Sequence, residues 1–460
     1  MRLWSSIRAL HLAGVAAMQC GVAYADDDWT KIAGGSIVSS VPALADFKKA
    51  LFDYGYNFQI NYTGETFGNP TGGVKQGAIY EGLLEMAVDG DLEKIAGLKG
   101  GTFHVNAYQI HGEGLSTNNI DNFMTVSSIE ARHSTRLFEL WYEQQLFDNK
   151  ASIRIGQMSA DAEFFVSDLG ALFLNATFGL PNKFAADLPS GGPAYPLATP
   201  AVRLKVTPTD ALTFLLAAFN GDPSGAGFNG LQEIEDLSGI NFRLRDPPLV
   251  LGEAQFRYYQ DKDSQGLAGT FKLGAWYHFG DFDDLRFGTD HLSLANPASN
   301  HAPVVYSGDY SLHAGIDQMV WRSSKADPTK GIGVFSRVSI SPTVRNLVNF
   351  YAEAGVTFNG LWDARPDDVF GVGVTYLGIS PEATALDMDA NFFAGSAMPV
   401  RDFESVIELT YQAHIAPGWN IQPDFQYIFR PGAGAVNPAN PAAGRIPDAA
   451  VFGLRTTFKF

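Results

Sequence analysis

Apolar and polar side chains alternate along the last eleven residues of the chain. One face carries Ala450, Phe452, Leu454, Thr456, Phe458 and Phe460, and the other carries Val451, Gly453, Arg455, Thr457 and Lys459. This period of two predicts a β-strand with one apolar and one polar side. Such a terminal strand is most useful in a closed sheet, where it pairs with the first strand and leaves no edge. We therefore expect a β-barrel, and the alternative is an edge strand of a soluble β protein.

The same alternation recurs through most of the chain. It is clearest in residues 53–62, whose apolar side is formed by Tyr54, Tyr56, Phe58, Ile60 and Tyr62. Aromatic residues near strand ends are typical of the interfacial girdles of membrane barrels. We count about 17 such segments, whereas single-chain bacterial barrels have even strand numbers. We therefore predict an all-β fold, a transmembrane antiparallel β-barrel of 16 strands. The weakest separation lies between residues 199–207 and 211–220.

Long and short connections separate the predicted strands. The long ones are residues 112–134, 159–198, 221–237, 280–307 and 431–447, whereas residues 148–150, 208–210 and 417–418 form short turns. Short turns at one end and long external loops at the other are typical of membrane barrels. Residues 159–198 are rich in Phe and Leu, so an exposed position would create an adhesive surface. We expect this loop to fold inward and narrow the pore; an added strand or a surface flap is the alternative.

The N-terminal region is expected to lie outside the barrel. Arg2 and Arg8 precede an apolar stretch, and Ala23 and Ala25 form a small-x-small cleavage site, so residues 1–25 are predicted to be a secretory signal peptide. Residues 26–52 are expected to form a periplasmic segment with a short amphipathic helix over residues 43–52. Residues 53–460 are expected to form the barrel.

Composition agrees with an exported barrel and excludes other classes. Cys20 is the only cysteine, so the mature chain has no disulfide. The net charge of −17 becomes −19 once Arg2 and Arg8 are removed, which argues against a nucleic-acid partner. No apolar run reaches the ~18 residues of a membrane helix. The mean hydropathy of −0.03 fits a barrel, because half of each spanning strand is polar.

The sequence shows no catalytic or metal-binding motif. It lacks Gly-x-Ser-x-Gly, His-Glu-x-x-His and P-loop patterns. The eight histidines that follow residue 25 are scattered, without the close spacing of metal ligands. We therefore predict no catalytic residue, no metal and no cofactor. A hydrolase with a serine and a histidine on the barrel wall is the enzymatic alternative.

The polar face of the strands carries the candidate functional residues, because it is expected to meet water inside the barrel. The candidates for the lumen and constriction are Glu81, Glu85, Tyr108, Glu139, Trp141, Glu143, Arg154, Arg203, Lys205, Trp276, Arg337, Glu353 and Asp424. Charged groups can hydrogen-bond sugar hydroxyls, and aromatic rings can stack on the C–H faces of sugar rings. The alternative is that these charges only solvate the channel and brace its wall.

Ten motifs in order along the chain resemble the OprB-type carbohydrate-selective porins of Gram-negative outer membranes. They are HGEGLS (111–116), STRLFELWYEQ (134–144), RIGQ (154–157), DAEFF (161–165), YPLATPAVRLK (195–205), FNGDP (219–223), LGAWYH (273–278), DQM (317–319), RPDD (365–368) and GLRT (453–456). The resemblance covers residues 54–460, nearly the whole mature chain. No single motif is decisive, but their number and order are.

The resemblance implies a 16-stranded barrel in the bacterial outer membrane that passes glucose and related monosaccharides by facilitated diffusion. It implies outer-membrane lipid as surroundings, no cofactor and no chemical step. It also implies a monomer, with a trimer as the alternative. A general diffusion porin without sugar selectivity is the main functional alternative.

Overall fold

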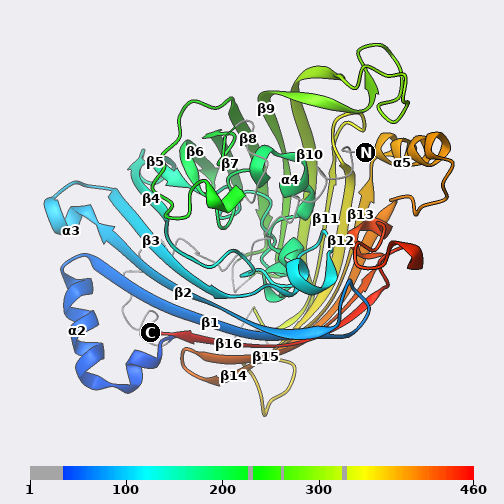
Figure 1. Cartoon of the computed structure of the whole chain (residues 1–460). Coiled ribbons are helices and arrows are strands. Elements are labelled where there is room, and N and C mark those ends of the chain that lie inside the picture. Colours follow the sequence, from blue (N-terminus) through cyan, green and yellow to red (C-terminus); the bar gives the residue numbers. More distant parts are fainter. Residues whose placement is uncertain (1–34, 226–231, 261–263, 324–328) are drawn as a thin grey trace.

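The computed structural model describes residues 35–225, 232–260, 264–323 and 329–460. The predicted signal peptide lies outside these residues, as does the segment up to residue 34. Sixteen antiparallel strands form one closed barrel in which each strand pairs with its neighbours in sequence and β1 pairs with β16 (Figure 1). The predicted 16-stranded barrel is therefore confirmed.

The strands differ in length, and the longest two project beyond the rest. Their bounds are β1 Tyr56–Thr71, β2 Gly77–Asp91, β3 Gly101–Gly112, β4 Ser134–Leu146, β5 Ala151–Met158, β6 Thr199–Thr209, β7 Leu212–Asn220, β8 Pro248–Tyr258, β9 Gly269–Gly288, β10 Pro303–Arg322, β11 Gly331–Ile340, β12 Val348–Asn359, β13 Val369–Ile379, β14 Phe403–Ala416, β15 Trp419–Phe429 and β16 Ala449–Lys459. β6 and β7, whose separation was the weakest in the sequence, are two distinct strands, because Thr209 pairs with Leu212 across a tight turn.

Helical segments precede β1 or lie in the connections between strands. They are η1 Ile37–Ser40, α2 Pro42–Asp53, α3 Leu92–Ala96, η2 Ser116–Ile120, η3 Gly170–Leu172, η4 Ala176–Phe178, α4 Asn182–Asp187, η5 Pro189–Gly191, η6 Gln232–Ile234, α5 Pro381–Ala394, α6 Pro431–Gly434 and η7 Pro441–Ala443. The helix α2 includes the residues for which a short helix is predicted. In the described part of the chain, no helix combines the length and apolarity needed to cross a membrane.

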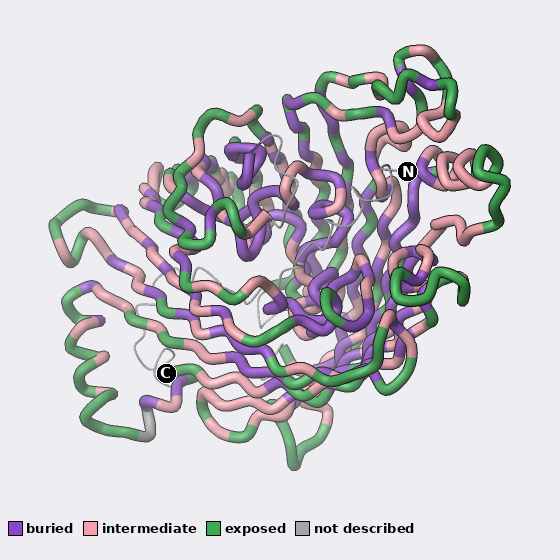
Figure 2. Tube along the Cα trace, viewed as in Figure 1, coloured by how far each residue is buried: buried purple, intermediate pink, exposed green. Residues whose placement is uncertain are grey.

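The two faces of the barrel wall differ in exposure, as alternation predicts. On β6, Val202 and Leu204 are 47% and 38% exposed, whereas Arg203 between them is fully buried. The terminal strand behaves alike, with Phe452 and Leu454 exposed and Val451 and Arg455 buried. Buried and exposed positions alternate along the strands in Figure 2. The apolar side chains therefore point outward, and the charged ones point into the barrel.

Phe138 departs from this pattern because β4 contains a bulge. The register shifts so that Leu137 faces Ala107 but Leu140 faces Val105, which leaves two residues of β4 opposite one of β3. An extra residue of this kind resets the alternation. The period of two along residues 138–143 predicts that Phe138 lies on the outward apolar face with Leu140 and Tyr142, and for Phe138 this prediction is wrong. Its ring is buried inside and stacks on Tyr108, with centroids 4.8 Å apart.

The loop predictions were partly wrong. Strands β9 and β10 extend through half of the predicted loop 280–307, which leaves residues 289–302 as the connection. The connection between β13 and β14, which holds α5, was not predicted. We call the end of the barrel with the long connections the outer end, and the end next to α2 and α3 the inner end (Figure 1).

Two connections fold into the barrel, and the buried core lies between them and the wall. Residues 159–198, which we call the inner loop, bury Phe164, Phe165 and Phe184 against a wall that includes Leu251 and Trp276. Residues 113–133 bury Leu115, Met124 and Val126 in a second cluster. The inward fold of the first loop is confirmed, whereas that of the second was not predicted.

Candidate functional site

Four predicted site residues meet on neighbouring strands of the inner wall. The register pairs Glu143 of β4 with Arg154 of β5, and Arg154 with Arg203 of β6. Lys205 follows two residues after Arg203 and faces Ser152. Directly opposite residues in an antiparallel sheet lie on the same face, so alternation places these side chains inward and the register brings them together.

The charges of this group form a compact network. Arg154 donates to Glu143 Oε2 from Nε at 2.9 Å and from Nη2 at 2.8 Å, and Arg203 Nη2 lies 3.2 Å from the same oxygen. Glu163 of the inner loop accepts from Arg203 Nη2 at 2.8 Å and lies 3.4 Å from Arg154. We call Glu143, Arg154, Glu163 and Arg203 the arginine–glutamate network. Its two positive and two negative charges make it neutral overall.

Trp141 extends this network with a stack of flat groups. The guanidinium carbon of Arg154 lies 3.8 Å from the ring centroid of Trp141, a cation–π contact. The indole also stacks on His104, whose Nδ1 lies 2.7 Å from Asp89 Oδ1. The wall therefore combines planar charged donors, carboxylate acceptors and an aromatic plane within a few residues.

Glu139, next to Trp141, fixes the start of the inner loop. Its Oε1 accepts from the backbone N–H of Ser159 at 2.8 Å and from the hydroxyl of the same residue at 3.1 Å. The loop thus leaves β5 in a defined direction, which places Glu163 beside Arg203. Glu139 is therefore both a predicted site residue and a support for the loop.

Three further candidates lie on the neighbouring strands β2 and β3. Glu85 accepts from Asn61 at 2.9 Å and from Asn106 at 3.3 Å, and Tyr108 lies opposite Glu85 in the register. Glu81 is buried and faces Glu65 of β1. This acidic group adjoins the arginine–glutamate network through β3 and β4.

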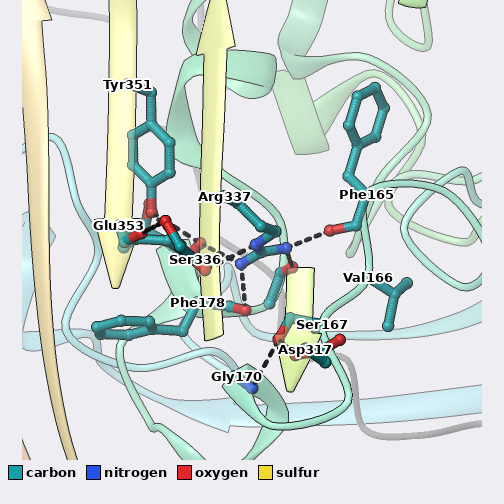
Figure 3. Close-up of polar contacts among 12 residues, drawn as sticks. Phe165, Val166, Ser167, Gly170, Phe178, Asp317, Ser336, Arg337, Tyr351 and Glu353 are labelled. Carbon is teal, nitrogen blue, oxygen red and sulfur yellow. Dashed lines mark hydrogen bonds and ion pairs between the residues drawn. The ribbon is translucent and has the colours of Figure 1, made fainter. Parts of the chain in front are cut away.

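The remaining four candidates lie apart from the network, under the inner loop. Arg337 donates from Nε to Glu353 at 2.6 Å (Figure 3). Its Nη1 donates to the carbonyl oxygen of Gly179 at 2.7 Å. It also donates to the carbonyl oxygens of Phe165 and Phe178. Its donors hold three points of the loop to β11.

The other three members of this group also serve the packing of the interior. Tyr351 donates to Glu353, and its oxygen accepts from the Thr177 hydroxyl at 2.8 Å. Asp424 accepts from Gln426, and Trp276 packs against the edge of Phe184. Direct substrate contact by Trp276, Arg337, Glu353 and Asp424 stays a prediction.

Carboxylates of the wall hold both inward loops by their backbone N–H groups. Glu408 of β14 accepts from Asn175 at 3.0 Å, and Glu404 accepts from Phe123 at 2.9 Å and Met124 at 2.7 Å. Hydrogen bonds between a carboxylate and backbone N–H groups are among the stronger ones in proteins. The interior is thus narrowed by segments anchored at many points across the barrel.

Sequence reasoning missed Glu163, His104 and the carboxylates Glu404 and Glu408. Glu163 lies in an irregular loop where alternation carries no information, and the motif DAEFF was its only signal. Glu404 and Glu408 lie on the inward face of β14, which alternates as clearly as its neighbours. Within the described residues, no group of three or more His, Cys, Asp and Glu is placed to hold a metal ion.

These features define a class: a membrane barrel with an apolar exterior, a charged interior and an inward loop, which is the architecture of a porin. Residues 75–460 match the family described as carbohydrate-selective porin, OprB family, and the chain belongs to this family. It is a porin of the bacterial outer membrane, and the members of its family are channels for carbohydrates.

Known proteins of similar sequence and structure agree with this assignment. Porin B of Pseudomonas aeruginosa is 26% identical over 83% of this chain and 84% of its own length. A putative porin, QuiX of Acinetobacter baylyi, is 20% identical over 90% of this chain and 91% of its own length. The high-pH structure of Pseudomonas putida OprB, 24% identical, covers 90% of this chain and 96% of its own, with a TM-score of 0.77. This structure supports the fold.

Proposed function

We propose that this porin carries glucose and similar monosaccharides by facilitated diffusion, with the arginine–glutamate network and Trp141 as its principal sugar contact. The supporting observation is the position of Arg154, between the plane of Trp141 and the carboxylates of Glu143 and Glu163. Sugar hydroxyls both donate and accept hydrogen bonds, so a neutral array of donors and acceptors suits them. The indole of Trp141 contacts both Arg154 and His104 and so keeps the guanidinium oriented toward the carboxylates.

Selectivity without trapping requires several weak contacts rather than one strong one. In the network, each guanidinium is already shared between two carboxylates, so a passing hydroxyl exchanges one partner for another. Such an exchange changes the free energy of the site little in either direction. The sugar is therefore retained briefly and moves on down its concentration gradient.

Sugar-induced interruption of ion current through single channels in planar bilayers tests this proposal. We expect Arg154→Ala to lower the affinity for glucose by about threefold to tenfold, as loss of one or two hydrogen bonds would. Arg286→Ala is the matched control, because Arg286 pairs with Asp389 of α5 at 2.8 Å, outside the barrel interior. Equal glucose block in wild type and Arg154→Ala would refute the assignment of the site.

We further propose that residues 1–25 direct export and are removed, and that a single barrel is the functional unit surrounded by lipid. The apolar exposed residues on β6 and β16, strands on different sides of the wall, support contact with lipid. N-terminal sequencing of the mature protein should begin at Asp26. The mass of the native protein in detergent should correspond to one chain, and a mass of three chains would refute the monomer.

A further inference from the structure

The apolar band on the outside of the barrel is interrupted at β5, the shortest of the sixteen strands. Its eight residues, at ~3.3 Å each and a tilt of ~45°, cover about 19 Å of the ~25 Å of a membrane barrel's apolar band. Ile153 and Ile155 are exposed on its outward face. Gln157 follows with the same orientation, because it pairs with the outward Leu140 of β4. A polar side chain therefore lies where the band should continue.

The connection between β7 and β8 covers Gln157. The Nε2 of Gln157 donates to the carbonyl oxygen of Gly239 at 2.8 Å and to that of Phe138 at 3.0 Å, and the side chain is only 3% exposed. The backbone N–H of Leu137 donates to the carbonyl oxygen of Ser238 at 2.9 Å. Residues 238–239 therefore bond to the edge of β4 beyond the end of β5. They also give the outward amide a partner, which acyl chains could not.

Gly239 makes this close approach to β4 possible. Its φ of +67° lies in the left-handed region, and a Cβ there would overlap the carbonyl oxygen of Leu137. Three residues earlier, the carbonyl oxygen of Asp236 accepts from Arg136 Nη2 at 2.8 Å. Arg136 lies opposite Tyr108, on the inward face of the wall. The chain therefore passes from the inner to the outer side of the wall between Asp236 and Gly239.

A second anchor holds the other end of this segment on β7. Asn220, the last residue of β7, donates to the carboxylate of Asp246 at 3.0 Å and accepts from the backbone N–H of Asp246 at 3.1 Å. Since one anchor lies on β4 and β5 and the other on β7, residues 240–245 cross the outer ends of β5 and β6.

The exposed side of the crossing segment is apolar. Ile240, Phe242 and Leu244 are 62%, 47% and 79% exposed. Arg243, between the last two, turns to the other side, where its guanidinium lies against the buried Gly225. The three apolar side chains therefore face away from the packed side of the connection. They lie beside the end of β5, where the outward face of that strand has no further apolar residue.

We propose that residues 240–244 form a lipid-contact surface that completes the apolar band above β5 and β6 and lies against acyl chains of the outer leaflet. The surface continues the outward faces of β4, β5 and β6, on which Leu140, Ile155 and Val202 are exposed. Acyl chains cover such a face in a membrane barrel. Three side chains fall far short of the ~800 Å² that each partner buries in a stable protein interface. The inference does not depend on sugar transport.

Nitroxide labels on single cysteines test this contact in lipid vesicles, because Cys20, in the predicted signal peptide, is the only cysteine. The variants are Phe242→Cys and Leu244→Cys. Val202→Cys is the reference for lipid, and Ala298→Cys, in the exposed part of the connection between β9 and β10, is the reference for water. Each label is measured for collision with oxygen, which partitions into lipid, and with a water-soluble nickel chelate. At positions 242 and 244 we expect the ratio of oxygen to nickel collisions to match position 202 and to exceed position 298 by about threefold or more.

Two results would overturn the lipid-contact surface. Labels at positions 242 and 244 that collide with nickel as often as the label at position 298 would show that the segment lies in water. Rare collision with both reagents would show that protein, such as a second copy of the chain, covers it. Wild-type ion conductance shows that the barrel of each variant has formed, and Ile240→Cys replaces a variant that fails to conduct.

Discussion

Replacing Arg337 with methionine tests how the inner loop is held in place. Methionine keeps much of the side-chain volume but removes the ion pair with Glu353 and the bonds to the carbonyl oxygens of Phe165, Phe178 and Gly179. Removing one partner of a buried ion pair costs about 3–5 kcal/mol, because the other charge is left uncompensated. Arg337 and Glu353 face each other on β11 and β12, and the loop that accepts from Arg337 covers them. We assign the cost to docking of the loop, because detachment of the loop lets water reach the uncompensated charge of Glu353.

A loss of 3–5 kcal/mol would raise the population of the detached loop by about two to four orders of magnitude. Lys183 reports this detachment, because it is the only Lys or Arg among residues 159–198. In the docked loop it is 1% exposed and paired with Asp187 at 2.7 Å. Trypsin should therefore cut Arg337→Met after residue 183 much faster than it cuts the wild type. Single-channel conductance should also rise and become noisier.

The double variant Arg337→Met with Glu353→Gln is the control for this prediction. It leaves no unpaired charge, so it should restore part of the protection at Lys183. Wild-type resistance to trypsin and wild-type conductance in Arg337→Met would refute the argument. The loop would then be held by its apolar contacts and by Glu408, without a measurable contribution from Arg337.

Three other predictions concern the loop, the site and the wall. Burial raises the pKa of Asp161 to about 7, so its contribution to loop docking is complete below pH ~4 and is lost as pH rises through 7. Trypsin resistance of the wild type should therefore fall between pH 4 and 8, and Asp161→Asn should remove this pH dependence. The same pH profile in Asp161→Asn and wild type would contradict the prediction. Glu139→Ala should alter glucose block more than the thermal stability of the barrel, and the reverse order would count against Glu139 as a site residue. A spin label at Phe58 should report acyl chains, and a spin label at Gln59 should report water. The opposite result would show that the assignment of the outward and inward faces of the wall is wrong.

Alternation predicted the barrel well because it reflects two solvents on two sides of one wall. It placed Glu143, Arg154 and Arg203 on the inward face, and their registers made them neighbours. It also predicted an inward position for residues 159–198, since so many Phe and Leu side chains need cover. Both results follow from burial of apolar surface, which local sequence records directly.

Other features could not be predicted because they depend on pairings between distant residues. The bulge at Phe138 arises from the register of β3 against β4, and no local signal marks it. The outer part of β9 carries Asp281, Asp283 and Asp284, so it resembles a polar loop although it forms a strand. The role of Glu404 depends on a loop 280 residues away in sequence, since it accepts from Met124.

Measuring the rate at which liposomes containing the wild-type porin swell tests sugar selectivity most directly. The solutes are glucose, a sugar alcohol of similar size and a neutral amino acid, with empty liposomes as the reference. Since the interior offers paired donors and acceptors beside the plane of Trp141, we expect glucose to enter faster than the other two. Swelling rates that depend only on solute size would contradict the account and would define a general diffusion pore.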